Sequence, residues 1–115
     1  MSQSKLQREF TACVGKLLSY AQSEGLGLTL GDAYRDPRVH GEFGTKKSYS
    51  AAKSVHKLRL AIDLNLFIGD QYITDGANPA YVKLGEFWET VHPLARWGGR
   101  FKDANHFSFE MWGCK

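Results

Sequence analysis

The sequence predicts an α+β fold, a small single domain in which helices flank an antiparallel sheet. Three observations support this prediction. The chain has 115 residues, which suits one domain with its own core, residues 1–115. Apolar residues recur at helical spacing near the N-terminus, whereas residues 58–68 alternate as a strand does. The predicted order of elements is helix, strand, loop, strand pair, helix, strand.

The first predicted helix covers residues 4–23. Apolar side chains recur there every three or four residues, which gives the helix one buried face. Ser4 and Gln7 have the spacing of a capping box at the start of the helix, and Gly25 supplies a stop.

A short strand and a long loop follow this helix. Residues 26–30 alternate leucine with glycine and threonine, which indicates a strand running toward Ala33-Tyr34-Arg35. Residues 36–49 are polar and contain two glycines and a proline, so they are predicted to form a loop. Loops of this length in small domains are often functional. Residues 50–54 are expected to form one helical turn.

The clearest strand pattern covers residues 58–68. One face carries only leucine and isoleucine, namely Leu58, Leu60, Ile62, Leu64, Leu66 and Ile68. The other face carries Arg59, Ala61, Asp63, Asn65 and Phe67. Strict period-two alternation is typical of a strand with one buried face. Gly69-Asp70 then predicts a hairpin turn into a strand at residues 71–74.

A second helix and a last strand complete the prediction. Asn78-Pro79 combines an N-cap residue with proline at the first helical position, and the helix is expected to run past Val91 until Pro93 ends it. The last strand covers about residues 106–111. Its two faces carry Phe107, Phe109 and Met111 on one side and His106, Ser108 and Glu110 on the other.

Composition excludes several classes of protein. Hydrophobic residues make up 43% of the chain and charged residues 23%, which argues against disorder. The net charge of +3 is too small to indicate nucleic-acid binding, although it is compatible with an anionic cell wall. No run approaches the roughly 18 apolar residues of a membrane span, and the N-terminus lacks the apolar segment of a signal peptide. The protein is therefore expected to stay in the cytoplasm unless another factor releases it.

The two cysteines do not form a recognisable metal or redox motif, because no CxxC pair is present. Cys13 lies on the apolar face of the first predicted helix and is interpreted as a small buried hydrophobic residue. The sequence does not decide whether Cys13 and Cys114 form a disulfide bond.

Three polar residues stand out against the strand patterns. His56 precedes the central strand, Asp63 lies on its non-leucine face, and His106 lies on the non-phenylalanine face of the last strand. Two histidines and a carboxylate can bind zinc and leave a fourth position for water, as catalytic zinc sites do. The alternative is that Asp63 faces water, since antiparallel sheets often have one solvated face. The residues alone leave both interpretations open.

Two segments resemble motifs of the M15 metallopeptidases, a family that includes D-Ala-D-Ala carboxypeptidases and the L-alanyl-D-glutamate endopeptidases of phage endolysins. Residues 54–63 (SVHKLRLAID) resemble the motif SxHxxGxAxD. Residues 97–107 (WGGRFKDANHF) resemble a motif of WGG followed by an aromatic residue and DxxHF. Arg59 stands where the family has glycine. From the strand pattern it is expected on the face of Asp63, reaching toward solvent or substrate.

The resemblance implies a role for each matching residue. It implies that zinc is bound by His56, Asp63 and His106. It further implies that Asp103 is the catalytic carboxylate, that Ser54 supports the site by hydrogen bonding, and that Arg35 holds a substrate carboxylate or stabilises an oxyanion. The implied fold is the one shared by D-Ala-D-Ala peptidases and hedgehog signalling domains. His40 and His92 match no motif.

The implied activity is zinc-dependent hydrolysis of peptidoglycan stem peptides by a monomer. The missing signal peptide favours a phage-type endolysin with L-alanyl-D-glutamate endopeptidase activity, which reaches the wall after holin-type release. One alternative is a D-Ala-D-Ala carboxypeptidase, and another is a non-catalytic zinc-containing module that binds wall peptides. Retention of Asp103 favours an enzyme. No serine or cysteine nucleophile has a partner base at recognisable spacing, so covalent catalysis is not expected.

Overall fold

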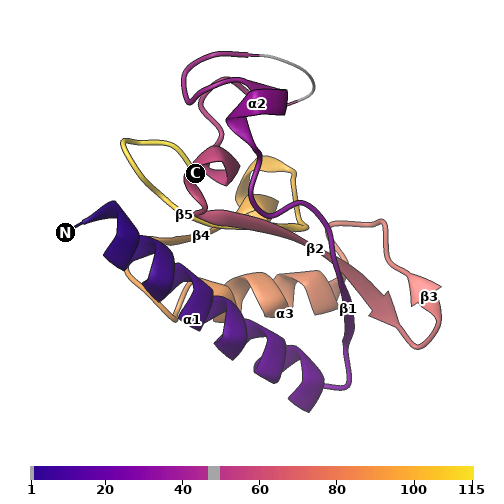
Figure 1. The fold of residues 1–115 in the computed structure, drawn as a ribbon. Coiled ribbons are helices and arrows are strands. Elements are labelled where there is room, and N and C mark those ends of the chain that lie inside the picture. The colour runs from indigo at the N-terminus through magenta and orange to yellow at the C-terminus, as the bar shows by residue number, and fades with distance from the viewer. Residues whose placement is uncertain (1, 47–49) are drawn as a thin grey trace.

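The computed structural model describes residues 2–46 and 50–115, so residues 47–49 of the predicted loop lie outside the described part. Within it, three α-helices, two 3₁₀ helices and five strands confirm the α+β class (Figure 1). In chain order they are α1 (Gln3–Ser23), β1 (Gly27–Leu30), α2 (Pro37–His40), η1 (Val55–Leu58), β2 (Ala61–Ile68), β3 (Gln71–Tyr72), α3 (Pro79–Trp88), β4 (Ala95–Trp97), η2 (Gly98–Phe101) and β5 (His106–Phe109).

The strands form one antiparallel sheet, as the sequence predicts. Its order is β1-β2-β5-β4, and β3 pairs with the distal end of β2 through the Gly69-Asp70 turn. Figure 1 shows α1 and α3 together on one face of the sheet, with η1 and the segment around α2 on the other side. The helices therefore cover one face, and the opposite side is left to the loops that carry polar side chains.

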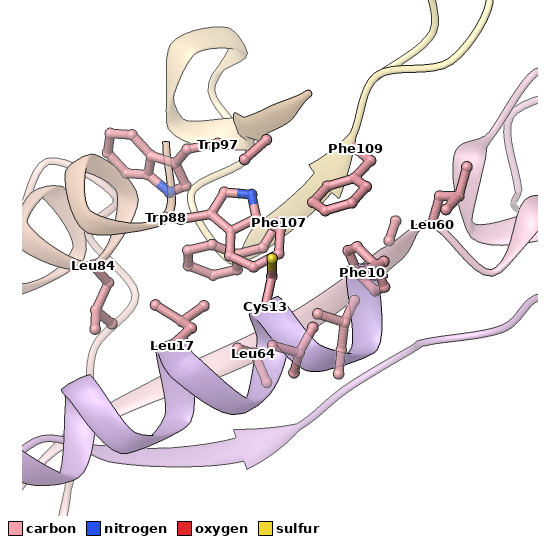
Figure 2. Packing of buried hydrophobic residues seen from close by; sticks show 14 of the residues in the cluster. Phe10, Cys13, Leu17, Leu60, Leu64, Leu84, Trp88, Trp97, Phe107 and Phe109 are labelled. Carbon is pink, nitrogen blue, oxygen red and sulfur yellow. The ribbon is translucent and has the colours of Figure 1, made fainter. Parts of the chain in front are cut away.

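The core lies between the two long helices and the sheet. Side chains of α1, including Phe10 and Leu17, point toward Trp88 of α3 and toward Phe107 and Phe109 of β5 (Figure 2). The Phe10 ring meets the Trp88 and Phe109 rings edge to face, with centroids 5.6 and 5.2 Å apart. Each such buried side chain stabilises the fold by roughly 1.5–3 kcal/mol. This core includes side chains of both β2 and β5 and so helps to fix the position of the two strands.

The first helix begins earlier than predicted. Ser2 is its N-cap, and the Ser2 hydroxyl accepts a hydrogen bond of 3.1 Å from the Lys5 amide. The predicted capping box at Ser4 and Gln7 is therefore wrong. The Gln7 side chain instead donates a 2.9 Å hydrogen bond to the carbonyl of Leu58, which ties α1 to η1. Gly25 follows the helix with a φ of +71°, as a stop residue requires.

The predicted loop and the predicted turn at residues 50–54 both need correction. Residues 37–40 form the short helix α2, because Asp36 caps it by accepting a 2.9 Å hydrogen bond from the Arg38 amide and Pro37 occupies the first turn. Residues 50–54 form no helix. The helical turn lies just beyond them, in η1, and Ser54 is its cap.

The central strand starts at Ala61, three residues later than predicted. Arg59 ends η1 in the left-handed region with a φ of +58°, so it does not share a strand face with Asp63. Its guanidinium lies 4.1 Å from the centroid of the Tyr34 ring. The position therefore needs the positive φ that glycine adopts freely. Arginine costs about 1 kcal/mol there, which the contact with Tyr34 partly offsets.

The remaining differences concern strand and helix ends. Helix α3 ends at Trp88 and does not continue past Val91, because the backbone turns there to bring β4 onto the sheet. Neither β4 nor η2 was predicted, since three or four residues are too few to show a period. The last strand stops at Phe109, and Met111 instead pairs with Cys114 in an isolated bridge. Likewise, β3 covers only Gln71–Tyr72.

Two further predictions concern the cysteines and the membrane. Cys13 is buried, as expected, and both Cys13 and Cys114 are free thiols. No helix in residues 2–46 and 50–115 is both long enough and apolar enough to cross a lipid bilayer.

Candidate metal centre

His56, Asp63 and His106 meet on the polar side of the sheet. Asp63 of β2 and His106 of β5 are direct partners in the antiparallel register, which places both side chains on one face. Asp63 Oδ1 lies 3.2 Å from His56 Nε2 and 3.5 Å from His106 Nδ1. The ligand atoms of all three residues lie within 4.8 Å of one another. They are close enough to share one metal ion.

Hydrogen bonds to the start of η1 fix the orientation of His56. The Ser54 hydroxyl accepts a 3.2 Å bond from the His56 amide, and His56 Nδ1 lies 2.8 Å from the carbonyl oxygen of Ala33. A carbonyl can only accept, so Nδ1 carries a proton, and Nε2, the ring nitrogen next to Asp63, is the one left for a metal. This arrangement is typical of a metal-binding histidine, in which one ring nitrogen is held by a hydrogen bond so that the other binds the metal.

The His106 ring is held differently. Its Nδ1 faces Asp63, whereas its Nε2 is buried and has no hydrogen-bond partner among the described residues. The Phe101 ring packs edge-on against it, with centroids 5.7 Å apart. Packing against Phe101, rather than a hydrogen bond to Nε2, therefore holds the His106 ring in its orientation.

Asp63 is an anion in this site. Burial raises the pKa of Asp63, but interactions with the His106 and His56 rings lower it by more, so this pKa lies well below its usual range. An ionised carboxylate beside two imidazole nitrogens is a donor set that suits zinc and similar divalent ions.

Arg35 contacts the same carboxylate from the other side. Its Nη2 lies 3.8 Å from Asp63 Oδ2, and its Nη1 donates 3.3 Å bonds to the hydroxyls of Ser50 and Ser54. Its Nε donates a 3.3 Å bond to the carboxylate of Asp32. The Arg35 side chain is only 15% exposed. These contacts allow Arg35 to orient Asp63 while one oxygen of that carboxylate faces the two histidines.

Buried Lys57 anchors the chain segment that carries Ser50. Its ammonium donates a 2.6 Å bond to the Thr45 carbonyl and longer bonds of 3.4 Å to the carbonyls of Glu42 and Ala52. Burial lowers the pKa of Lys57. The sequence pattern gave no sign of this lysine, because its three acceptors come from a loop without periodicity.

Asp103 lies at the edge of the cluster. Its Oδ2 is 4.0 Å from His106 Nδ1, and its side chain is 54% exposed. The turn that carries it is held by a 2.8 Å bond from the Asp103 amide to the Gly98 carbonyl and a 3.0 Å bond from the His106 amide to the Asp103 carbonyl. A Cβ at Gly98 would collide with the Asp103 carbonyl oxygen and approach the His106 Cβ to 2.7 Å. The glycine thus allows Asp103 and His106 to share one tight turn.

The structure therefore brings together all of the site residues that the sequence analysis names. Two partners of Arg35, Asp32 and Ser50, were missed, and only the nearness of Asp32 to Arg35 in sequence could have suggested either. Of the two other histidines, His40 is the buried last residue of α2, and His92 lies beside Phe109. His92 stacks on the Phe109 ring at 4.3 Å, and its Nδ1 accepts a 3.0 Å bond from the Leu94 amide, which indicates a structural role.

Comparison with known protein families assigns most of the site to one family. A model of an M15 peptidase family, described as D-alanyl-D-alanine carboxypeptidase, matches residues 48–109, more than half of the chain. The matched segment includes His56, Asp63, Asp103 and His106 and does not extend to Arg35. No curated protein matches the chain.

Proposed function

Because this chain belongs to the M15 peptidase family, we propose that it is a zinc-dependent peptidase that hydrolyses the stem peptides of peptidoglycan. The observation that carries the proposal is the convergence of His56, Asp63 and His106, with the carboxylate of Asp103 beside them. Two imidazoles and one carboxylate would hold zinc with three protein ligands, the number typical of catalytic sites. When bound, zinc supplies Lewis acidity and makes water a nucleophile at neutral pH.

The protein's own residues have distinct parts in this mechanism. Asp103 takes the proton from the attacking water and passes it to the leaving amine, a role that suits a carboxylate open to solvent at the edge of the site. Ser54 orients His56 through the backbone of η1. Arg35 either offsets negative charge near the reacting carbonyl or orients the carboxylate of Asp63, which it contacts.

The proposal also names the peptide bond that is hydrolysed. We favour the L-alanyl-D-glutamate bond and a phage-type endolysin that acts as a monomer after holin-type release. The description of the matching family supports a second candidate, a D-Ala-D-Ala carboxypeptidase. A non-catalytic module that binds wall peptides is a third, but such a module has no need of a carboxylate placed like that of Asp103.

Digestion of purified Gram-negative peptidoglycan tests the activity. We expect new amino groups and no new reducing sugar ends, because the proposed chemistry breaks amide bonds only. Mass spectrometry of the released fragments distinguishes the two candidate bonds: a new D-glutamate N-terminus indicates the endopeptidase, and free D-alanine indicates the carboxypeptidase. Reducing ends without amino groups would mean that the protein is a glycosidase and that the proposal is wrong.

Replacing Arg35 with lysine tests the role of its guanidinium. We expect kcat/KM to fall by at least about tenfold, because lysine cannot reproduce the planar fork that contacts several oxygens at once. Steady-state kinetics and zinc titration on the same preparation separate the two roles. Unchanged zinc affinity indicates contact with substrate or oxyanion, and weakened zinc affinity indicates that Arg35 acts by orienting Asp63.

Arg38 provides a matched control for this substitution, since its side chain is 88% exposed and lies on α2. Arg38→Lys should leave both measurements unchanged. If Arg35→Lys behaves like Arg38→Lys, then Arg35 has no part in the reaction.

A further inference from the structure

A groove of about 650 Å³ has Asp103 in its lining and none of the three candidate metal ligands. One wall consists of the chain after β2, with Tyr72 of β3, the following residues to Ala77, and the start of α3. The other wall consists of residues 97–105, from the end of β4 through η2 to the turn before β5. Grooves of this size are typical of sites that hold small ligands or short peptides.

More positive than negative side chains line the groove. It contains two cations, Arg100 and Lys102, and one carboxylate, Asp103. Arg100 is already neutralised, because its Nη2 lies 2.8 Å from the Glu89 carboxylate. Lys102 is exposed and makes no ion pair with any residue of the described ranges. One ammonium next to the proposed general base is thus left to pair with an anion from outside the protein.

The backbone fixes this lysine beside Asp103. Lys102 ends η2 in the left-handed region with a φ of +63°, a conformation that residues other than glycine adopt only at a cost. The same short turn, closed by the bond from the Asp103 amide to the Gly98 carbonyl, carries both side chains. Lys102 and Asp103 both line the groove, so a ligand that reaches Asp103 from the groove also lies near Lys102.

The position of the general base indicates which part of a peptide would occupy the groove. In the proposed mechanism Asp103 passes its proton to the leaving amine, so the residues on the amine side of the scissile bond lie next to Asp103. A glutamate that is linked through its γ-carboxyl, as in a stem peptide, keeps a free α-carboxylate on the same residue that supplies this amine. This carboxylate can pair with the ammonium of Lys102, which has no ion-pair partner among the described residues.

We propose that the groove binds the amine-side part of the substrate and that Lys102 selects a free carboxylate on the residue that follows the scissile bond. This inference rests on the proposed function and adds a determinant of substrate specificity to it. Lys102 positions the substrate and takes no part in proton transfer.

The test compares two synthetic stem peptides that differ only at this carboxylate, which is either free or converted to the carboxamide. The zinc-loaded wild type should hydrolyse the amide about three- to tenfold less efficiently, the worth of a partly exposed charge-assisted contact. Lys102→Met should lose the same factor on the free carboxylate, mainly through KM, and nothing further on the amide. Lys102→Arg should restore most of the preference.

Two further variants control for stability and for net charge. Lys102→Gly also removes the ammonium, but it suits the left-handed backbone, so its selectivity should match that of Lys102→Met although its effect on stability differs. Lys16→Met changes an exposed lysine on α1 and should leave both peptides unaffected. Equal losses on both peptides, or wild-type kinetics for Lys102→Met, would overturn the inference.

The proposed function and this inference can fail separately. If the wild type hydrolyses neither peptide, the peptidase proposal fails. A binding experiment then tests whether the groove still recognises the carboxylate. Amide chemical shifts of residues 99–105 should then respond to the free carboxylate and not to the carboxamide, and Lys102→Met should abolish the response. Absence of that response would refute the subsite as well.

Discussion

Replacing His56 or His106 with alanine should remove zinc and peptidase activity together while the fold persists. Each histidine supplies one of only three protein ligands, so we expect zinc affinity to fall by more than the 10- to 100-fold that loss of an outer hydrogen-bond partner costs. The core between the helices and the sheet does not depend on the site, so circular dichroism should stay that of the wild type. Elemental analysis and hydrolysis of wall peptides on one preparation measure both effects.

Chelation provides the corresponding experiment on the unmodified chain. Removing the metal should abolish activity, and adding zinc should restore it. His92→Gln is a useful control, because His92 is an imidazole that stacks on Phe109, away from the cluster, and its loss should leave one zinc per chain. A protein that contains no zinc after purification without chelators, and gains none on addition, would refute the metal assignment.

The sequence predicted the central strand well from Ala61 onward, and the reason is physical. Leu64 and Leu66 are fully buried against the helices while Asp63 remains on the polar side, so burial itself imposes the alternation. The same pattern misled at the start of the strand. Leu60 is fully buried and Leu58 nearly so, yet they belong to a 3₁₀ turn and its exit. Two buried leucines with one residue between them do not distinguish these conformations.

The candidate site was predictable only in part. Periodicity gave the face of Asp63 and the face of His106, but the pairing of β2 with β5 that brings them together is a long-range event without a local signal. The resemblance to M15 motifs supplied that link. The contacts of Arg35 with Ser50 and of Lys57 with Thr45 depend on how separate loop segments pack, and no pattern of residues encodes such contacts.

Replacing Asp103 with asparagine should separate catalysis from metal binding. Asparagine is nearly isosteric but cannot accept a proton at neutral pH. We expect activity to fall by about 10²- to 10⁴-fold, the usual worth of general acid–base catalysis. The hydrogen bonds that place this turn use the backbone of Asp103 and survive the substitution. Zinc content and wall-peptide hydrolysis are to be measured on the same preparation.

The geometry makes zinc retention the critical part of this result. The Asp103 carboxylate lies 4.0 Å from His106 Nδ1 and is more than half exposed, whereas Asp63 lies between the two histidines and is 18% exposed. A fourth protein ligand would close the position that catalytic zinc keeps for water. If Asp103 were that ligand, zinc affinity would fall in step with activity, and if it were neither ligand nor base, activity would barely change. Asp70→Asn, at the exposed hairpin turn, controls for the loss of one carboxylate and should leave zinc content and hydrolysis unaltered. Only a large loss of activity with full zinc content agrees with a general base held beside an open metal site.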